Sequence, residues 1–449
     1  MRFSCTDAYF GVLHLLPSPY MTNSIAEALN TTLRDENPVA FAMLSARGKA
    51  IFFPVTGILG QTADARGKTY NATIGIALEQ DGSPMYLPSL LQSYGRTPKD
   101  VVTYSPSFGE AELRTTWQTR IRKATPSLQS GISLPVVTAG ITHALDCAGA
   151  LFVDAGDAII LPDKFWDNYR LTFENNHSGT VKFFETFTED AFNVSALEEA
   201  VKSVHGRKKI LLLNFPNNPC GYTPTHEEVE EICALLHRRA EAGDQLVVFI
   251  DDAYYGLVFE EGVTTESLFG KIAGLHENIL AVKIDGATKE DCAWGLRVGF
   301  LTFGMKGLTA KGLQALEHKA AGMVRSSVSN ACHHSQSALM SLYSAPSYEE
   351  EKRQKFALLQ ERYREVRRVL AAHPEFATSF TPYPFNSGYF LCVQLADGLD
   401  AETVRQTLLT QYDTGVIAIG SMIRIAYSAL RTEDISPVFQ NLHNACITP

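Results

Sequence analysis

The stretch that decides the fold reads Asp285-Gly-Ala-Thr-Lys289-Glu-Asp-Cys-Ala-Trp-Gly-Leu-Arg297-Val-Gly299. The run before it, residues 279–284, is mostly apolar and partly β-branched, which predicts a buried strand. Lys289 then lies in the loop at the carboxyl end of that strand, the edge where ligands bind in open α/β sheets. A second apolar run, residues 298–303, begins directly after Arg297. A lysine near an arginine is by itself more often two solvated charges than a site, so support must come from the rest of the chain.

Three further motifs supply that support, because each follows an apolar run that predicts a strand. They are Gly140-Ile-Thr142-His-Ala-Leu145 after residues 134–138, Asn218-Pro-Cys-Gly221 after residues 210–213, and Asp251-Asp-Ala-Tyr254 after residues 246–250. From about residue 95 to residue 300, strand-like runs alternate with helical patterns. This alternation indicates a mostly parallel α/β sheet that is covered by helices on both faces.

Taken together, these motifs resemble the class I/II aminotransferases that depend on pyridoxal phosphate, the fold-type-I group. The resemblance spans roughly residues 70 to 430 and is strongest to the aspartate and aromatic aminotransferase branch. It implies a large cofactor-binding domain over residues 86–345 and a smaller α+β domain over residues 346–449. Residues 1–85 would form an N-terminal segment that contributes to the small domain.

The resemblance assigns the cofactor's reactive end to four residues. Lys289 would form the Schiff base and later move the substrate proton, which requires an amine whose pKa is lowered by burial or by neighbouring cations. Asp251 would pair with the pyridine nitrogen and keep it protonated. Asn218 and Tyr254 would donate hydrogen bonds to the phenolic oxygen. Two nearby residues are expected to lie outside the site, namely Lys283, which has a structural position in mid-strand, and Asp252, which faces solvent.

The phosphate of the cofactor needs backbone N–H groups and a cation. Gly140, Ile141 and Thr142 lead into a helix whose first amides can hold an anion, and Arg297 offers a guanidinium fork. Tyr104 resembles the tyrosine that reaches the phosphate of a neighbouring subunit, so the resemblance implies a symmetric homodimer. The sequence departs from the family at Gly286, where many members carry a serine that binds the phosphate; Thr288 is a candidate replacement.

The remaining site residues come from the family's substrate side. Trp166 resembles the aromatic residue that stacks on the pyridine ring, with Phe165 and Tyr169 as alternatives. Arg424 resembles the arginine that pairs with the substrate α-carboxylate. Two further residues are expected to approach the substrate, namely Gly75, in a strand over residues 71–77, and Asn168. Arg325 aligns with the family's arginine for a distal carboxylate. Nearby, Val328 stands where the family usually has an aromatic residue.

Composition excludes several other classes of protein. The 449 residues carry a formal net charge of −10 that is spread along the chain, which argues against a nucleic-acid partner and an anionic membrane surface. No run of about 18 apolar residues predicts a membrane span, and the N-terminus lacks a signal-peptide pattern. The eight cysteines show no metal-type spacing, so we expect reduced thiols, no metal and a cytoplasmic location.

The function predicted from these observations is a ping-pong aminotransferase that exchanges the amino group of an L-amino acid with a 2-oxo acid such as 2-oxoglutarate. One alternative is a pyridoxal-phosphate-dependent lyase that carries out β- or γ-elimination in the same site. A second is a non-catalytic regulator that binds the cofactor.

The sequence also predicts a long charged helix after Ser347, with a capping box between Ser347 and Glu350 and an end before Pro374.

Overall fold

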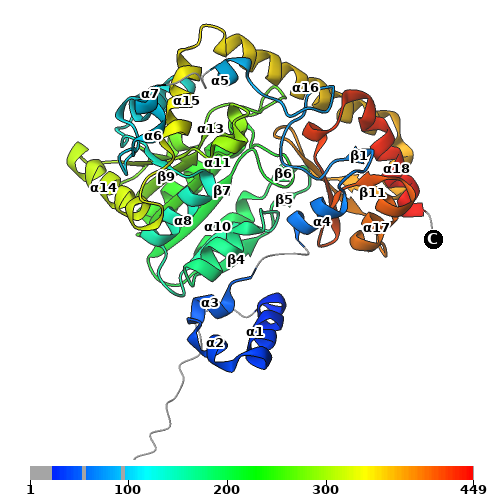
Figure 1. Cartoon of the computed structure of the whole chain (residues 1–449), viewed down its shortest axis with the longest axis horizontal. Coiled ribbons are helices and arrows are strands. Elements are labelled where there is room, and N and C mark those ends of the chain that lie inside the picture. The colour runs from blue at the N-terminus through cyan, green and yellow to red at the C-terminus, as the bar shows by residue number, and fades with distance from the viewer. Residues whose placement is uncertain (1–22, 53–56, 93–96, 448–449) are drawn as a thin grey trace, which may run out of the picture.

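A seven-stranded sheet with the order β2-β10-β9-β8-β7-β3-β4 forms the centre of the computed structural model, which describes residues 23–52, 57–92 and 97–447 (Figure 1). All neighbouring strands run parallel except at β10, which is antiparallel to both β9 and β2. The strands are β2 (Val136–Thr138), β3 (Ala158–Pro162), β4 (Thr180–Phe184), β7 (Lys208–Asn214), β8 (Gln245–Asp251), β9 (Ile279–Asp285) and β10 (Gly299–Met305). The mostly parallel α/β sheet predicted from the sequence is therefore confirmed.

Helices cover both faces of this sheet because successive strand residues point to opposite sides. In β7, Ile210 and Leu212 belong to one buried cluster, and Leu211 and Leu213 belong to another. The first cluster contains α8 (Ile141–Phe152) and α14 (Ala310–Ser327). The second contains α7 (Ala111–Ala124), α10 (Val194–Ser203), α11 (His226–Glu241), α12 (Phe269–Ile272) and α15 (His333–Ser344).

The carboxyl ends of the central strands meet at one edge of the sheet. Asn214, the last residue of β7, pairs in register with Asp251, the last residue of β8, and Asp251 pairs with Ile284 near the end of β9. The loops after these three strands carry the Asn218, Asp251 and Lys289 motifs, respectively. The register therefore gathers residues from three separate motifs at one place.

A second, antiparallel sheet of four strands has the order β11-β12-β15-β14. Its strands are β11 (Phe380–Pro382), β12 (Leu391–Leu395), β15 (Met422–Ile425) and β14 (Ile417–Ile419). The helices nearby are α16 (Tyr348–Ala372), α17 (Ala401–Gln411) and α18 (Ile435–Ile447). The loop before β12 contacts the Asn218 loop, since Asn386 and Ser387 both donate backbone hydrogen bonds to the Gly221 carbonyl. Arg424, in the middle of β15, is thereby brought to the edge of the large sheet.

One part of the N-terminal segment contacts a short helix beside the large sheet, and another part contacts strands near the C-terminus. Helices α1 (Ser24–Glu36), α2 (Pro38–Met43) and α3 (Ala46–Ala50) form a group below the large sheet in Figure 1. The Asn175 amide of the short helix η1 (Leu171–Asn176) donates to the Ala50 carbonyl there. By contrast, β1 (Tyr70–Asn71) pairs with β13 (Thr414–Gly415) in a separate two-stranded sheet, and α4 (Ile58–Asp64) contacts β13 and the small-sheet strand β14. The predicted domain boundaries at residues 86 and 346 stay a prediction.

Two local expectations were wrong. The strand expected over residues 71–77 ends at Asn71, because beyond it the chain bonds to Gly415 and Ala426 in an irregular course. The capping box at α16 does not form: the Ser347 hydroxyl contacts the Ser89 hydroxyl at 2.7 Å, and Glu350 binds Arg353. A contact with a distant residue thus occupies the Ser347 hydroxyl, and a pair within the same helix occupies Glu350. Within the part of the chain that the structure describes, no helix is long and apolar enough to cross a membrane.

Candidate active site

A cavity of about 160 Å³ lies at the carboxyl edge of β7, β8 and β9, where the two sheets meet. Its lining comes from the loops after these strands, from the start of α8 and from strand β15. The structure brings together there most of the residues predicted from the sequence, namely Gly75, Ile141, Thr142, Trp166, Asn218, Asp251, Tyr254, Lys289, Arg297 and Arg424.

Lys289 lies on α13 (Ala287–Glu290), a single turn that follows β9 directly. Its amine is 4.9 Å from the centroid of the Tyr254 ring. Burial lowers the pKa of this amine to about 8; the Arg297 charge also lowers it, and the Asp251 charge opposes the shift. An amine with this pKa is free in a substantial fraction of molecules near neutral pH, which an ordinary lysine is not.

Asp251 lies at the bottom of the cavity and is held by neutral donors. The Tyr169 hydroxyl donates to its Oδ2 at 2.6 Å, and the Ala253 backbone N–H donates to its Oδ1 at 3.0 Å. Burial raises the pKa of Asp251, although the Tyr169 hydrogen bond and the Lys289 charge oppose this rise. A buried carboxylate of this kind attracts a cation, because no arginine or lysine pairs with it directly among the described residues.

Asp252 does not face solvent as expected; its exposed fraction is 3%. The carboxylate pairs with the Lys283 amine and accepts a hydrogen bond from the Ser267 hydroxyl. Burial alone would lower the pKa of Lys283, but the charges of Asp252 and Asp285 raise it above its ordinary value. Lys283 is therefore a charged, structural lysine, as predicted. The adjacent carboxylates of Asp251 and Asp252 have different partners, since Asp251 lines the cavity and Asp252 pairs with Lys283.

Backbone segments cross very closely at one end of the cavity. A Cβ atom added at Gly140, whose φ is +87°, would lie 2.5 Å from Nη2 of Arg297. A Cβ added at Gly286 would lie 2.6 Å from the Val298 carbonyl oxygen, so a serine does not fit at this position without backbone movement. Nearby, Thr288 has a buried hydroxyl that lacks a hydrogen-bond partner among the described residues. Thr288 therefore offers the polar group that Gly286 cannot.

Arg424 lies on the opposite side of the cavity and is 2% exposed. Its Nη1 donates to the Asn218 side-chain oxygen and its Nη2 to the Thr73 carbonyl, both at 3.1 Å. The guanidinium carbon lies 4.3 Å from the centroid of the Phe390 ring. Its buried Nε–H group has no partner among the described residues. A buried arginine with no carboxylate partner there and one unused N–H is suited to bind an anion from the cavity.

Four predicted site residues do not line this cavity. Gly140 lies just outside it, where it packs under Arg297, and Asn168 begins the short helix α9 (Asn168–Arg170). Tyr104 is 91% exposed on the surface of the chain. Arg325 is exposed in the last turn of α14, where its Nη1 donates to the Ser329 hydroxyl at 2.7 Å. Neither Tyr104 nor Arg325 contacts the cavity of its own chain.

The lining residues that the sequence analysis did not assign to the site include Tyr169, Asn214 and Phe390. Tyr169 was considered only as a stacking alternative to Trp166, but its hydroxyl binds Asp251. Asn214 accepts from the Asn218 backbone N–H at 2.8 Å and donates to the Asp251 carbonyl at 2.9 Å. Phe390 lies under Arg424. A signal existed for Asn214, the polar residue that ends an apolar strand, but the contacts of Tyr169 and Phe390 join segments far apart in sequence.

Comparison with known proteins identifies the family. Residues 89–442 match the family described as aminotransferase class I and II. An aspartate aminotransferase of Thermotoga maritima is 29% identical over 268 residues, which cover 60% of this chain and 68% of that protein. A probable N-acetyl-LL-diaminopimelate aminotransferase of Bacillus subtilis is 26% identical over 205 residues, 45% of this chain, and the chain spans about half of that relative, 48%.

Among solved structures, an aminotransferase from Anaerococcus prevotii superposes with a TM-score of 0.80 at 25% sequence identity, covering 90% of this chain and 100% of that one. The family match includes all four sequence motifs at the cavity and Arg424. It confirms the resemblance read from those motifs. The chain thus belongs to the class I and II aminotransferases, a family of pyridoxal-phosphate-dependent enzymes with the type I fold.

Proposed function

We propose that this protein is a pyridoxal-phosphate-dependent aminotransferase that moves an amino group between an L-amino acid, of the aspartate or aromatic type, and a 2-oxo acid such as 2-oxoglutarate. The observation that carries the proposal is the buried Lys289 amine, whose pKa is lowered to about 8, in one cavity with Asp251 and Arg424. Bound pyridoxal phosphate supplies an aldehyde for the amino group and a protonated ring that accepts electrons from the substrate Cα.

The residues present fit the phosphate end of the cofactor. Helix α8 begins after Gly140, so its first amides and the Thr142 hydroxyl can donate to an anion in the cavity. Arg297 adds a positive charge, and its left-handed backbone, with φ at +54°, is the kind of strained conformation that persists where surrounding structure requires it. The unpartnered Thr288 hydroxyl would replace the serine that Gly286 excludes.

The other end of the cavity fits the ring. Asp251 would hold a proton on the ring nitrogen, because a buried carboxylate is stabilised by an opposite charge. Tyr169 would keep the carboxylate in place through its 2.6 Å hydrogen bond. Trp166, half-buried in the lining, would pack on one face of the ring and exclude water. Asn218 and Tyr254 would hold the phenolic oxygen.

Substrate recognition is assigned to the side nearest β15. Arg424 would bind the α-carboxylate of the amino acid, for which its buried, unpartnered Nε–H is available. Gly75 lines the same cavity, where a Cβ would make an ordinary van der Waals contact with the Phe390 ring at 3.6 Å. Asn168 would approach the same carboxylate. With the cofactor bound, the Lys289 amine would act as the general base that takes the proton from the substrate Cα, and as the general acid that delivers it to the cofactor carbon that bore the aldehyde.

An amino-exchange assay tests this function. Purified protein with pyridoxal phosphate is incubated with single L-amino acids and 2-oxoglutarate, and glutamate formation is measured. Exchange with aspartate or aromatic donors is the expected result. Formation of ammonia and a 2-oxo acid without an added keto acid would instead indicate the lyase alternative, and cofactor binding without any turnover would indicate a regulator.

Arg325 gives a specificity prediction in the same assay. We propose that it reaches the distal carboxylate of acidic substrates in a neighbouring subunit, because it is exposed and contacts no cavity in its own chain. A bidentate charged contact contributes roughly 1.5–3 kcal/mol. Arg325→Ala is therefore expected to lower kcat/KM for aspartate or glutamate by about tenfold to a hundredfold. Aromatic donors, which lack this carboxylate, serve as the internal control; equal losses for both donor classes would refute the assignment.

The same surface supports a homodimer. Tyr104 and Val102 are highly exposed, at 91% and 76%, and Val328 is also exposed. Their segments adjoin, since the Ser107 hydroxyl donates to the Ser329 carbonyl at 2.7 Å. We expect a dimer at micromolar concentration in sedimentation, with Tyr104 completing a neighbour's site, and Val102→Asp is expected to weaken it. A fully active monomer would overturn this prediction.

The described cysteines are free thiols, which supports the expected cytoplasmic location.

A further inference from the structure

The two residues that follow Lys289 are both carboxylates, and both are held by side chains from elsewhere in the fold. Asp291 is fully buried and accepts hydrogen bonds from the Tyr343 hydroxyl at 2.8 Å and from the Tyr348 hydroxyl at 2.6 Å. Glu290 pairs with Arg120 and Lys352. These partners come from three different helices, α7, α15 and α16. The turn that carries the catalytic lysine is therefore tied to three helices at its carboxyl end.

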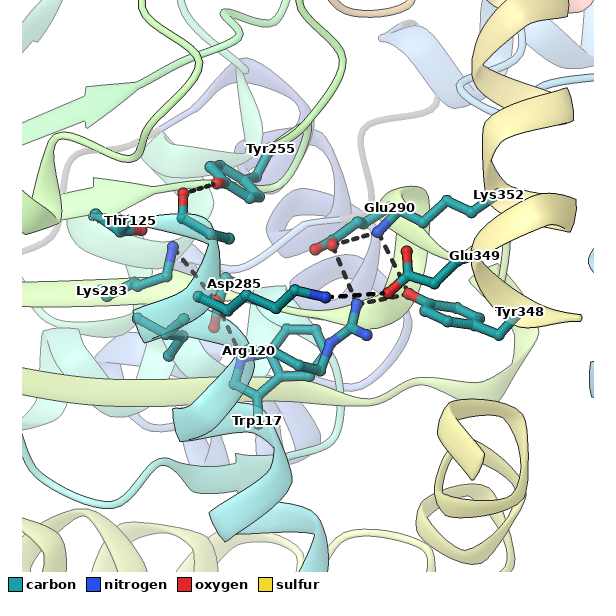
Figure 2. Close-up of a pocket in the computed structure, with 13 residues that line it drawn as sticks. Trp117, Arg120, Thr125, Tyr255, Lys283, Asp285, Glu290, Tyr348, Glu349 and Lys352 are labelled. Carbon is teal, nitrogen blue, oxygen red and sulfur yellow. Dashed lines mark hydrogen bonds and ion pairs between the residues drawn. The ribbon is translucent and has the colours of Figure 1, made fainter. Parts of the chain in front are cut away.

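Figure 2 shows the Glu290 part of this arrangement, which lines a second cavity of about 260 Å³. Arg120 and Lys352 pair there with Glu290, and Tyr348 lies beside them, while Lys283 and Asp285 of β9 lie on the other side. Arg120 also donates to the Tyr348 hydroxyl at 2.6 Å, and its Nη2 is 3.7 Å from Asp291 Oδ1. The cations in this group are thus already paired with carboxylates of the protein. The cavity is therefore lined by ion pairs within the protein, although the buried Arg120 Nε has no hydrogen-bond partner among the described residues.

We propose that Asp291, together with Tyr343 and Tyr348, is a positioning group that holds the Lys289 turn so that its amine stays desolvated in the catalytic cavity. The inference rests on the proposed function, in which Lys289 carries the cofactor. Within the turn, the Asp291 backbone N–H donates to the Ala287 carbonyl at 3.1 Å, and the Lys289 carbonyl accepts from Cys292 N–H and from the Tyr389 hydroxyl, both at 3.3 Å. Fixing Asp291 therefore fixes the turn on which Lys289 stands.

Electrostatics supports a strong anchor. Burial alone would raise the pKa of Asp291, but the Lys352 and Arg120 charges and the two phenol donors hold it below its ordinary value. The carboxylate is therefore ionised at neutral pH and makes charge-assisted hydrogen bonds, which are stronger than neutral ones. The groups that face the Lys289 amine are different ones, namely Asp251, Tyr254 and Arg297, with Arg424 in the same cavity.

This separation gives the test a distinctive sign. Burial is the main cause of the lowered Lys289 pKa. Loosening the turn admits water to the amine and therefore raises its pKa. Mere removal of a nearby negative charge would instead lower the pKa, because a carboxylate stabilises an ammonium ion. A rise in the Lys289 pKa in Asp291→Asn would thus report positioning and not a direct charge effect.

The experiment measures the reactivity of the amine in the full-length protein after its cofactor has been removed. Trace acetic anhydride is applied between pH 6 and pH 10, and the acetylation rate of Lys289 is followed by peptide mass spectrometry. In the wild type the rate is expected to titrate near pH 8. In Asp291→Asn the midpoint is expected to rise by about one pH unit, which lowers labelling at pH 7 about tenfold.

Two further variants keep the result interpretable. The double variant Tyr343→Phe/Tyr348→Phe removes both hydroxyls without changing any charge. The same rise in the Lys289 midpoint is expected for it, and it serves as the test if Asp291→Asn fails to fold. Tyr363→Phe is the matched control: Tyr363 also lies on α16 and its hydroxyl binds a carboxylate, that of Glu260, but it does not contact the turn. Folded variants with the wild-type midpoint, or an equal shift in Tyr363→Phe, would overturn the proposal. Labelling of Lys289 requires no turnover. Failure of this test can therefore be distinguished from failure of the proposed aminotransferase activity.

Discussion

Replacing Lys289 with alanine is expected to abolish covalent attachment of pyridoxal phosphate and to lower kcat by at least about 10²–10⁴-fold. The proton transfer assigned to Lys289 alone accounts for a factor of this size. The folded state should tolerate the change, because the Lys289 amine makes no ion pair with any residue that the structure describes, and alanine favours the helical turn on which it stands. Removing a buried amine also removes a desolvation cost. We therefore expect a folded protein without turnover.

The measurement is borohydride reduction of the protein loaded with pyridoxal phosphate. Peptide mapping then identifies the lysine that carries the pyridoxyl group. The wild type should carry the pyridoxyl group on Lys289, and Lys289→Ala should carry none. Lys271→Ala is the control, since Lys271 pairs with Glu230 at the surface and should be labelled and active like the wild type. Mapping of the group to Lys283, the buried lysine six residues earlier, would show that the wrong lysine was assigned.

The second large effect is expected for Asp251→Asn, which should lower kcat by about 10²–10³-fold, as when one preorganised charge is removed from a site where charge develops. Asparagine keeps the shape of the side chain, and its oxygen can still accept from the Ala253 N–H, while its amide nitrogen can donate to the Tyr169 hydroxyl oxygen. It cannot stabilise a proton on the ring nitrogen. Binding of the cofactor should weaken, because its cationic ring loses its counter-charge, while the fold is preserved.

Asp252→Asn is the matched control for this variant. It makes the same chemical change one residue later, on a side chain that pairs with Lys283 and Ser267 away from the cavity. It should lower the melting temperature, since Lys283 loses a buried partner, and leave the cofactor affinity and kcat near wild-type values. Comparable kcat in Asp251→Asn and the wild type would show that another group protonates the ring.

The sequence determined the sheet and the chemical identity of the site. Apolar runs that end in Asn218, Asp251 and Lys289 motifs are local signals, and parallel strands place the ends of such runs at one edge. Arg424 was also readable, because an arginine flanked by apolar residues in a strand is hard to place in solvent. These features depend on the order of residues along each strand, which does not change on folding.

Tertiary structure decided which neighbouring side chain entered the cavity and what held it there. Asp251 and Asp252 are chemically alike, and Asp252 was expected to face solvent; only the tertiary structure shows that Asp252 is buried against Lys283, while Asp251 accepts from Tyr169 in the cavity. The close crossing of Gly286 and Val298 excludes the usual serine, which no local pattern reveals. Likewise, the local sequence does not show that Glu290 and Asp291 are held by partners from α7, α15 and α16. Contacts between distant segments form only when the chain folds. They therefore do not produce a periodic or local pattern by which the sequence alone would reveal them.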